Sequence, residues 1–256
     1  MSLSRALWGP PVPIRRRNGR LEVLGIPLTP LDMPGFVDEV ARRLDAGQRG
    51  IVLFTPDAWA TSRAILDDSL LRLYREADLV ACDGVGLALA ARAFGQPVPR
   101  VPGADLAWSL CARAAREGWG VYLLGGRPGI AARAAARLRR AFPGIKVVGF
   151  WHGYFQDEGP VAEVRRLRPD LLLVGMGFPR QERWILSHRD VGAGLLMGVG
   201  GTFDLWAGRF PRAPRLIRLW GLEWLWRALV DPRRFIRLWC VPFLLYQIVV
   251  CRLRAR

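Results

Sequence analysis

Cysteine and histidine are scarce in this chain of 256 residues, which has four cysteines and two histidines. The cysteines lie far apart and form no CxxC pair, which argues against a disulfide framework or a zinc knuckle and fits a reducing compartment. Two histidines are too few for a histidine-rich metal site. The sequence also lacks GxxxxGK followed by Ser or Thr, which excludes a P-loop ATPase.

Long apolar runs are missing too. The longest, Trp239–Cys251, covers 13 residues and contains Pro242 and Gln247, whereas a helix that spans a bilayer needs about 20. Residues 1–20 hold a Gly-Pro-Pro-Val-Pro segment where a signal peptide would have its apolar centre, so we expect a flexible arm there. The apolar run is expected to lie at an interface or to dock on the protein.

Acidic residues are outnumbered, because 38 Lys and Arg against 22 Asp and Glu give a formal net charge of +16. Lys146 is the only lysine. Residues 209–256 contain eleven arginines, two acids and four tryptophans, which contributes +9 to the total charge. A basic stretch rich in tryptophan favours an anionic surface, either a membrane or a nucleic acid.

Short apolar runs bounded by Gly, Pro or Asp alternate with helical patterns along the chain. The runs predict buried strands at Ile51–Phe54, Leu79–Cys82, Val121–Leu124, Lys146–Gly149, Leu171–Gly175 and Leu195–Val199. The intervening segments predict helices at Asp32–Leu44, Pro56–Tyr74, Gly84–Phe94, Ala104–Glu117, Pro128–Phe142, Val161–Leu167 and Arg180–His188. The alternation predicts an α/β fold with a mostly parallel sheet and helices on both faces.

Strand patterns stop near residue 209, where the basic stretch begins. We therefore divide the chain into a flexible arm (1–20), an α/β core (21–208) and a helical appendage that associates with membranes (209–256). In a parallel sheet, ligands bind at the carboxyl ends of the strands, so the residues that follow each strand are the candidate site.

Glycine-rich turns follow three of the predicted strands. Gly125 and Gly126 open a strand-to-helix turn where a phosphate could approach backbone N–H groups and a helix N-terminus. The alternative is a tight turn that needs a positive φ. The turns that contain Gly175 and Gly200-Gly201 are similar, and none of the three completes GxGxxG.

Carboxylates follow two other strands. Asp83 is positioned to accept a proton from an attacking hydroxyl group, or else to cap the helix at Gly84–Phe94. In Thr55-Pro56-Asp57, a helix cap at Thr55 followed by a first-turn acid is the structural interpretation, and hydrogen bonds to sugar hydroxyls are the functional one.

Gln181 and Glu182 open a further helix. Glu182 is most simply a first-turn acid, whereas the Gln181 amide can both donate to and accept from a sugar or a base. His188 is interpreted as a helix-end residue, and His152 as part of an aromatic loop that forms either a pocket wall or plain packing.

Taken together, these motifs make the chain resemble the WecG/TagA/CpsF glycosyltransferases of bacterial surface-polymer synthesis. The matching segments run in family order over about residues 21–240: TPDA (55–58), ADLVACDGVGLALAAR (77–92), RVPGADL (100–106), VYLLGGRPG (121–129), GFWHGYF (149–155), PDLLLVGMGFPRQERWI (169–185), GVGGTFDLWAG (198–208) and RAPRLIRLWGLEWLWRALVDPRR (212–234).

The resemblance implies a Rossmann-like, inverting and metal-independent transferase without a cofactor. It would move a sugar, of the N-acetylmannosamine type or a related hexose, from a UDP-sugar to a polyprenyl-diphosphate-linked saccharide. Asp83 matches the family's proposed base, and Thr55, Arg100 and Gln181 match proposed sugar-binding residues. The basic appendage would dock on the cytoplasmic face of the inner membrane as a peripheral anchor. Homo-oligomers are possible, and a nucleic-acid partner is not expected.

From these expectations we assign provisional roles. Asp57 joins the sugar side, and the diphosphate would contact Gly125, Gly126, Gly175, Gly200, Gly201, Asp204, Arg212 and Arg215, since arginine matches phosphate oxygens. The sequence departs from the family at Asp57, where Asn is usual, and at Pro102, where a small residue is usual. A carboxylate at position 57 disfavours an anionic donor sugar and offers a competing base.

Two rival functions remain at this point. A nucleotide-dependent oxidoreductase would share the fold, but the sequence lacks a full GxGxxG with an acid about 20 residues beyond it. A non-enzymatic, basic membrane- or nucleic-acid-binding module would explain the appendage and leave five strand-end loops without a role.

Overall fold

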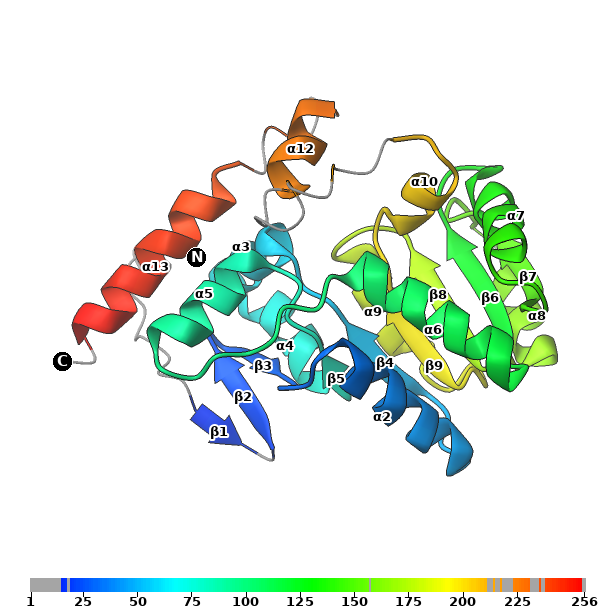
Figure 1. Cartoon of the computed structure of the whole chain (residues 1–256), viewed down its shortest axis with the longest axis horizontal. Coiled ribbons are helices and arrows are strands. Elements are labelled where there is room, and N and C mark those ends of the chain that lie inside the picture. The colour runs from blue at the N-terminus through cyan, green and yellow to red at the C-terminus, as the bar shows by residue number, and fades with distance from the viewer. Residues whose placement is uncertain are drawn as a thin grey trace.

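A computed structural model describes residues 15–17, 19–156, 158–210, 214, 217, 223–230, 235 and 238–254. Its centre is a six-stranded parallel sheet in the order β5-β4-β9-β8-β6-β7 (Figure 1). The strands are β4 (Ile51–Phe54), β5 (Leu79–Val80), β6 (Gly120–Gly125), β7 (Lys146–Trp151), β8 (Leu171–Gly175) and β9 (Leu195–Gly198). The predicted α/β fold is confirmed, and the predicted strand ends differ by two residues at most.

Helices cover both faces of this sheet, because alternate residues of each central strand enter two separate hydrophobic clusters. Leu171 and Leu173 of β8 point to one face, and Leu172 and Val174 point to the other. The first face packs against α2 (Met33–Asp45), α6 (Gly103–Glu117), α7 (Ile130–Ala141) and α10 (Thr202–Trp206). The second packs against α3 (Ala58–Leu66), α4 (Asp68–Glu76), α5 (Val85–Ala93), α8 (Gly159–Leu167) and α9 (Arg180–Ser187).

The single helix predicted at Pro56–Tyr74 is wrong, because two helices occupy this segment. Asp67 is extended, with φ −141°, and its carboxylate accepts from the N–H of Ser69, so α4 starts anew after α3. Asp57, and not Thr55, is the N-cap of α3, since its Oδ1 accepts from the N–H of Ala60 at 2.8 Å. The helix cap therefore falls on Asp57, and Thr55 is left at the end of β4.

A three-stranded antiparallel sheet that the sequence analysis did not predict precedes the core. It consists of β1 (Arg15–Arg17), β2 (Arg20–Val23) and β3 (Ile26–Leu28). Val23 and Leu28 are fully buried against the cluster that contains α4 and α5. Residues 15–17 pair as a strand, so the loose arm predicted for residues 1–20 does not extend over them, and residues 1–14 lie outside the described part.

The last described helix, α13 (Cys240–Arg254), packs on α3 and α5, as Figure 1 shows at the C-terminal, red end of the chain. Leu244 and Ile248 of α13 belong to the main hydrophobic cluster, and Gly86 of α5 leaves room for Leu244. A Cβ atom at Gly86 would lie 2.5 Å from the Leu244 side chain. A shorter helix, α12 (Glu223–Val230), precedes it. None of the helices described has the length and apolar character needed to cross a membrane.

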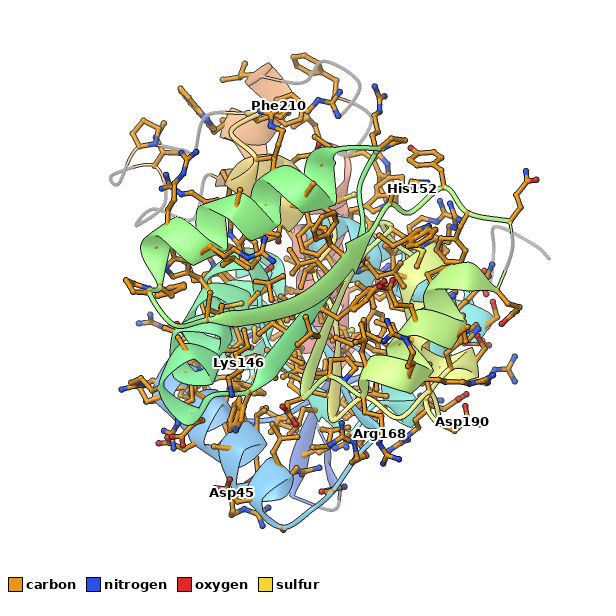
Figure 2. The ribbon with its side chains drawn as sticks, turned by 90° about the vertical axis from the view of Figure 1, so that its right-hand side faces the viewer. Asp45, Lys146, His152, Arg168, Asp190 and Phe210 are labelled. Carbon is orange, nitrogen blue, oxygen red and sulfur yellow. The ribbon has the colours of Figure 1, made fainter. Side chains whose placement is uncertain are left out.

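The carboxyl ends of the strands gather at one end of the molecule. Figure 2 looks onto the β7 edge, where His152 follows the strand at the same end as Phe210. Asp45, at the end of α2, lies at the opposite end together with Arg168 and Asp190, which precede β8 and β9.

Candidate active site

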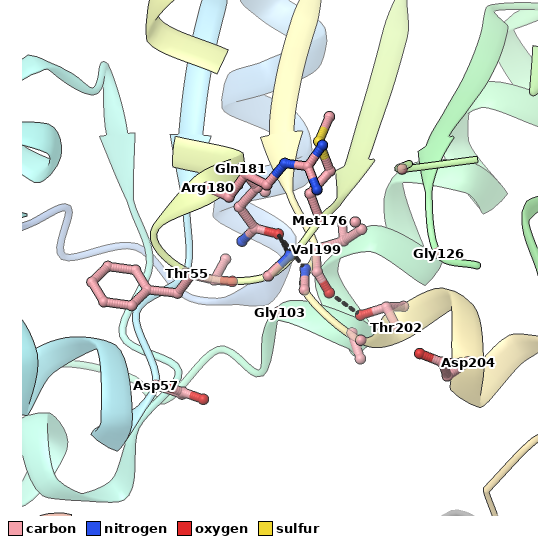
Figure 3. A pocket seen from close by; sticks show the side chains of 18 of the residues that line it. Thr55, Asp57, Gly103, Gly126, Met176, Arg180, Gln181, Val199, Thr202 and Asp204 are labelled. Carbon is pink, nitrogen blue, oxygen red and sulfur yellow. Dashed lines mark hydrogen bonds between the residues drawn. The ribbon is translucent and has the colours of Figure 1, made fainter. Parts of the chain in front are cut away.

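A cleft of about 310 Å³ opens at the carboxyl ends of the parallel strands (Figure 3). It is lined by residues that follow β4, β5, β6, β8 and β9 together with the first turns of α6 and α9. Nine of the predicted site residues line it: Thr55, Asp57, Asp83, Gly126, Gly175, Gln181, Gly200, Gly201 and Asp204. Gly125 and Arg100 do not line the cleft, and Arg212 and Arg215 lie outside the described residues.

Asp83 is held by the loop that leads into α6. Its Oδ2 accepts from the N–H of Gly103 at 3.1 Å, and its backbone carbonyl accepts from Nε of Arg100 at 3.0 Å. The cap of α5 is Gly84, with no side-chain hydrogen bond, so the alternative role of Asp83 as a helix cap is wrong. The half-buried carboxylate is therefore oriented by α6 and Arg100 at the cleft wall.

Glycine at position 103 allows three segments to meet. A Cβ atom there would lie 2.9 Å from Cβ of Thr55 and 3.3 Å from Oδ2 of Asp83, and it would overlap Oγ1 of Thr55. The threonine hydroxyl and the aspartate carboxylate thus both lie next to the same glycine. A hydroxyl group and a carboxylate are therefore close together in this part of the cleft.

Gln181 is almost fully buried, with 5% of its surface exposed, and its amide connects two loops. Its Oε1 accepts from the N–H of Gly200 at 2.9 Å and from the N–H of Gly177 at 3.2 Å (Figure 3). Its Nε2 donates to Oε1 of Glu182 at 3.0 Å. The amide was predicted to contact sugar, and it also ties the loop after β8 to the loop after β9.

Glu182 also lies on the cleft wall, although only 4% of it is exposed. The pKa of its carboxyl is raised from 4.5 to about 7, mainly by burial. The hydrogen bond from Gln181 opposes this rise, and the nearby charge of Asp57 adds to it. Oε2 of Glu182 and the hydroxyl of Tyr74 are both buried, and neither has a hydrogen-bond partner among the described residues. The sequence interpretation of a simple first-turn acid missed this burial, which arises from packing against distant residues.

Backbone N–H groups in two of the glycine turns form hydrogen bonds within the protein. The N–H of Gly126 donates to the carbonyl of Gly175 at 2.9 Å, and the N–H of Gly200 is engaged by Gln181. The N–H of Gly126 is thus engaged by the end of β8, and the assignment of Gly126 to the diphosphate stays a prediction. A Cβ atom at Gly125 would overlap the Gly175 carbonyl oxygen, so glycine is required for the strands to approach.

Three arginine side chains bring positive charge to the cleft. Arg127, Arg180 and Arg209 line the cleft, and Arg209 forms an ion pair with Asp204 at 3.1 Å. Arg127 precedes α7, whose N-cap is Gly129 and has no capping side chain. None of these three arginines was predicted to bind a ligand, although Arg127 and Arg180 lie within glycine-rich segments of the sequence.

The two histidines lie outside the cleft lining. His188 is the C-cap of α9 and stacks on Trp184 with ring centroids 4.3 Å apart, which confirms its interpretation as a helix-end residue. Nδ1 of His152 accepts from the N–H of Tyr154 within the aromatic loop. Over the described residues, no group of three or more His, Cys, Asp or Glu side chains is placed to hold a metal ion.

Most of the chain matches a known protein family. The family described as Glycosyl transferase WecG/TagA/CpsF matches residues 21–256. Proteins of Staphylococcus aureus strains NCTC 8325 and COL are each 30% identical over 240 residues, which covers 91% of this chain and 94% of theirs. Both are named N-acetylglucosaminyldiphosphoundecaprenol N-acetyl-beta-D-mannosaminyltransferase.

Proposed function

This chain belongs to the WecG/TagA/CpsF family of glycosyl transferases, and we propose that it moves a neutral N-acetylhexosamine from a UDP-sugar to a polyprenyl-diphosphate-linked saccharide. The enzyme is a glycosyltransferase of cell-surface polysaccharide synthesis. The proposed acceptor follows the S. aureus relatives, whose name specifies a diphosphoundecaprenol carrier. The proposed donor is a sugar without a carboxylate, because Asp57, Asp83 and Glu182 all line the cleft.

The observation that carries this proposal is the position of Asp83 at the cleft wall, oriented by Gly103 and Arg100. In an inverting transfer, the acceptor hydroxyl attacks the anomeric carbon, its proton passes to a base, and the bond to the UDP oxygen breaks. One carboxylate is sufficient for the proton, and Asp83 is that base in our proposal. Thr55 and Asp57, with the Nε2 of Gln181, are assigned to the sugar, whereas Arg100, which does not line the cleft, holds the backbone of Asp83.

The order of the strands suggests where the sugar and the diphosphate of the donor bind. Asp83 and Thr55 follow β5 and β4 at one side of the sheet, whereas Gly126 and Arg127 follow β6 towards the other. Figure 3 shows Thr55 and Asp57 on one side and Gly126 and Asp204 on the other. We assign the diphosphate to the second side, where Arg127 and the uncapped start of α7 provide positive charge for the leaving group.

The test is transfer of radiolabelled sugar from UDP-N-acetylmannosamine, UDP-N-acetylglucosamine or a UDP-uronate to a short-chain polyprenyl-diphosphate N-acetylglucosamine. We expect turnover with one of the neutral N-acetylhexosamine donors and none with the uronate. We propose that the transfer needs no metal ion, so the rate measured in the presence of EDTA should equal the rate measured in its absence. Transfer only from a nucleotide other than UDP, or a rate that EDTA abolishes and magnesium restores, would contradict the proposal.

We also propose that the enzyme works as a peripheral protein at the cytoplasmic face of the membrane, where its lipid-linked acceptor resides. The outer face of α13 supports this, since it carries a run of exposed apolar side chains: Leu245, Tyr246, Val249 and Leu253. The exposed Trp239 lies at the start of the same helix. Tryptophan and apolar residues on one helix face, next to a basic stretch, are typical of interfacial helices.

Replacing both Leu245 and Val249 by Asp should lower binding to vesicles of phosphatidylglycerol and phosphatidylethanolamine by at least tenfold. The reason is that two apolar side chains leave the interface and two negative charges enter it. The matched control replaces Val148 and Phe150, which are exposed on the β7 edge away from α13, by Asp. If both double variants sediment with vesicles to the same extent, the proposal that α13 contacts the membrane is contradicted.

A further inference from the structure

We propose that Glu182 is a positioning residue, which orients the Gln181 amide so that it holds the loops after β8 and β9 at a fixed separation. The pair Gln181 and Glu182 is called the amide brace below. The consequence for nucleotide affinity rests on the function proposed above, whereas the consequence for the two loops does not. From the sequence, Glu182 was interpreted only as an acid in the first turn of a helix.

The orientation of an amide is decided by what its two ends meet. Two backbone N–H groups, from Gly177 and Gly200, point at one end of the Gln181 side chain. Only the oxygen can accept from them, so the NH₂ group must point the other way, where it needs an acceptor. Oε1 of Glu182 provides that acceptor at 3.0 Å inside the protein. Whether the carboxyl group is ionised or protonated, Oε1 can accept this hydrogen bond, so Glu182 favours this orientation of the amide.

Packing leaves the brace little freedom to move. Gln181 and Glu182 are both at least 95% buried, and a Cβ atom at Gly198 would lie 2.9 Å from Nε2 of Gln181. Glycine at position 198 therefore leaves the space that the amide occupies. Gly177 and Gly200 both have positive φ angles, of 79° and 53°, so their N–H groups are turned inward by backbone conformations that suit glycine.

Burial of the Glu182 carboxyl is unfavourable for the stability of the fold. This favours a functional role for Glu182 over a purely structural one. Its Oε2 is buried and has no hydrogen-bond partner in the part of the chain that the structure describes, and Asp57 brings a second negative charge towards it. A residue present only to stabilise the fold would not combine these features. Asp57 at the start of α3 disfavours a negative charge on this carboxyl. Burial, with the charges of Glu182 and Asp57, raises the pKa of Tyr74 on α4, so that hydroxyl is neutral.

The test compares Glu182→Met, which removes the acceptor, with Glu182→Gln, which keeps an acceptor oxygen. In the Met variant, hydrogen exchange at the amides of Gly177 and Gly200 should accelerate at least tenfold, as read by mass spectrometry of peptides that cover 175–181 and 198–203. The affinity for UDP, measured by calorimetry, should fall about tenfold. The Gln variant should retain both the protection and the affinity. The matched control is Glu163→Met, which removes the half-buried acceptor of the Tyr122 hydroxyl outside the cleft lining and should alter neither readout.

A second route to the same result covers the case in which Glu182→Met fails to fold. Gly198→Ala keeps Glu182 and pushes on Nε2 of Gln181, so it should raise exchange at the same two amides. The Glu182→Gln variant should also have a melting temperature roughly 2–4 °C above that of the native protein at pH 8 and equal to it at pH 5, because ionisation of Glu182 destabilises the fold as the pH rises towards 7.

Unchanged exchange at Gly177 and Gly200 in both Glu182→Met and Gly198→Ala would overturn the proposal. So would a Glu182→Gln variant that loses protection as the Met variant does, because the acceptor oxygen would then not be the cause. If the native protein binds no UDP while the exchange results are as expected, the proposed function fails and the amide brace stands.

Discussion

Replacing Asp83 by Asn should lower the rate of sugar transfer by about 10²–10⁴-fold while the affinity for UDP stays within a factor of two or three. The Asn side chain keeps an oxygen that can accept from the N–H of Gly103, so the loop before α6 should remain in place. What the variant loses is the ability to take the proton of the acceptor hydroxyl. Steady-state rates at saturating donor and acceptor, with UDP affinity by calorimetry, measure both parts.

Asp57→Asn is the informative comparison, because Asp57 is the other carboxylate next to Thr55 in the cleft. Asn caps a helix as well as Asp does, so α3 should remain intact and turnover should stay within about tenfold of the native rate. A near-normal rate for Asp83→Asn, combined with a large loss for Asp57→Asn, would transfer the role of base to Asp57.

Leu244→Ala should destabilise the protein by about 2–5 kcal/mol, the range for removing a buried leucine from a close-packed core. Leu244 is 1% exposed and fills the space above Gly86 of α5, so the smaller side chain leaves a cavity between the two helices. The neighbouring Leu245 is 48% exposed, and Leu245→Ala should change the free energy of unfolding by less than about 0.5 kcal/mol. Urea unfolding of both variants measures the difference.

Equal stability of the two leucine variants would mean that α13 is not part of the folded core. This comparison also replaces the simpler experiment of deleting everything after Gly208. Such a deletion would remove Leu244, Ile248 and Cys251 from the main hydrophobic cluster along with the membrane-facing side chains. Loss of activity in the truncated chain would then not distinguish a missing anchor from a damaged core.

The central sheet could be predicted from the sequence because each of its strands is a short apolar run with a clear end. Ile51–Phe54 and Leu171–Gly175 coincide with β4 and β8 for this reason. The N-terminal antiparallel sheet could not be predicted, since its strands are three or four residues long and β1 consists of arginines. Its stability depends on burial of Val23 and Leu28 against α4 and α5, which are distant in the sequence.

The candidate site divides in the same way. Position after a strand was enough to bring Thr55, Asp83 and Gly126 to one cleft, because parallel strands end at a common edge. Which of their groups are available to a ligand depends on hydrogen bonds that the sequence does not indicate, such as the one from Gly126 to Gly175. The burial of Glu182 likewise depends on long-range packing, so residue type and spacing suggested only a first-turn acid.

The contact between Gly103 and Thr55 restricts how the donor preference of this enzyme could be altered by directed evolution. Any side chain at position 103 would overlap the threonine hydroxyl, and any residue larger than threonine at position 55 would meet the start of α6. Substitutions at the two positions are therefore coupled, and single-site libraries at either one would sample mostly misfolded or inactive chains. Asp57 has no such constraint at its carboxylate beyond the cap, so it is the more productive position at which to begin.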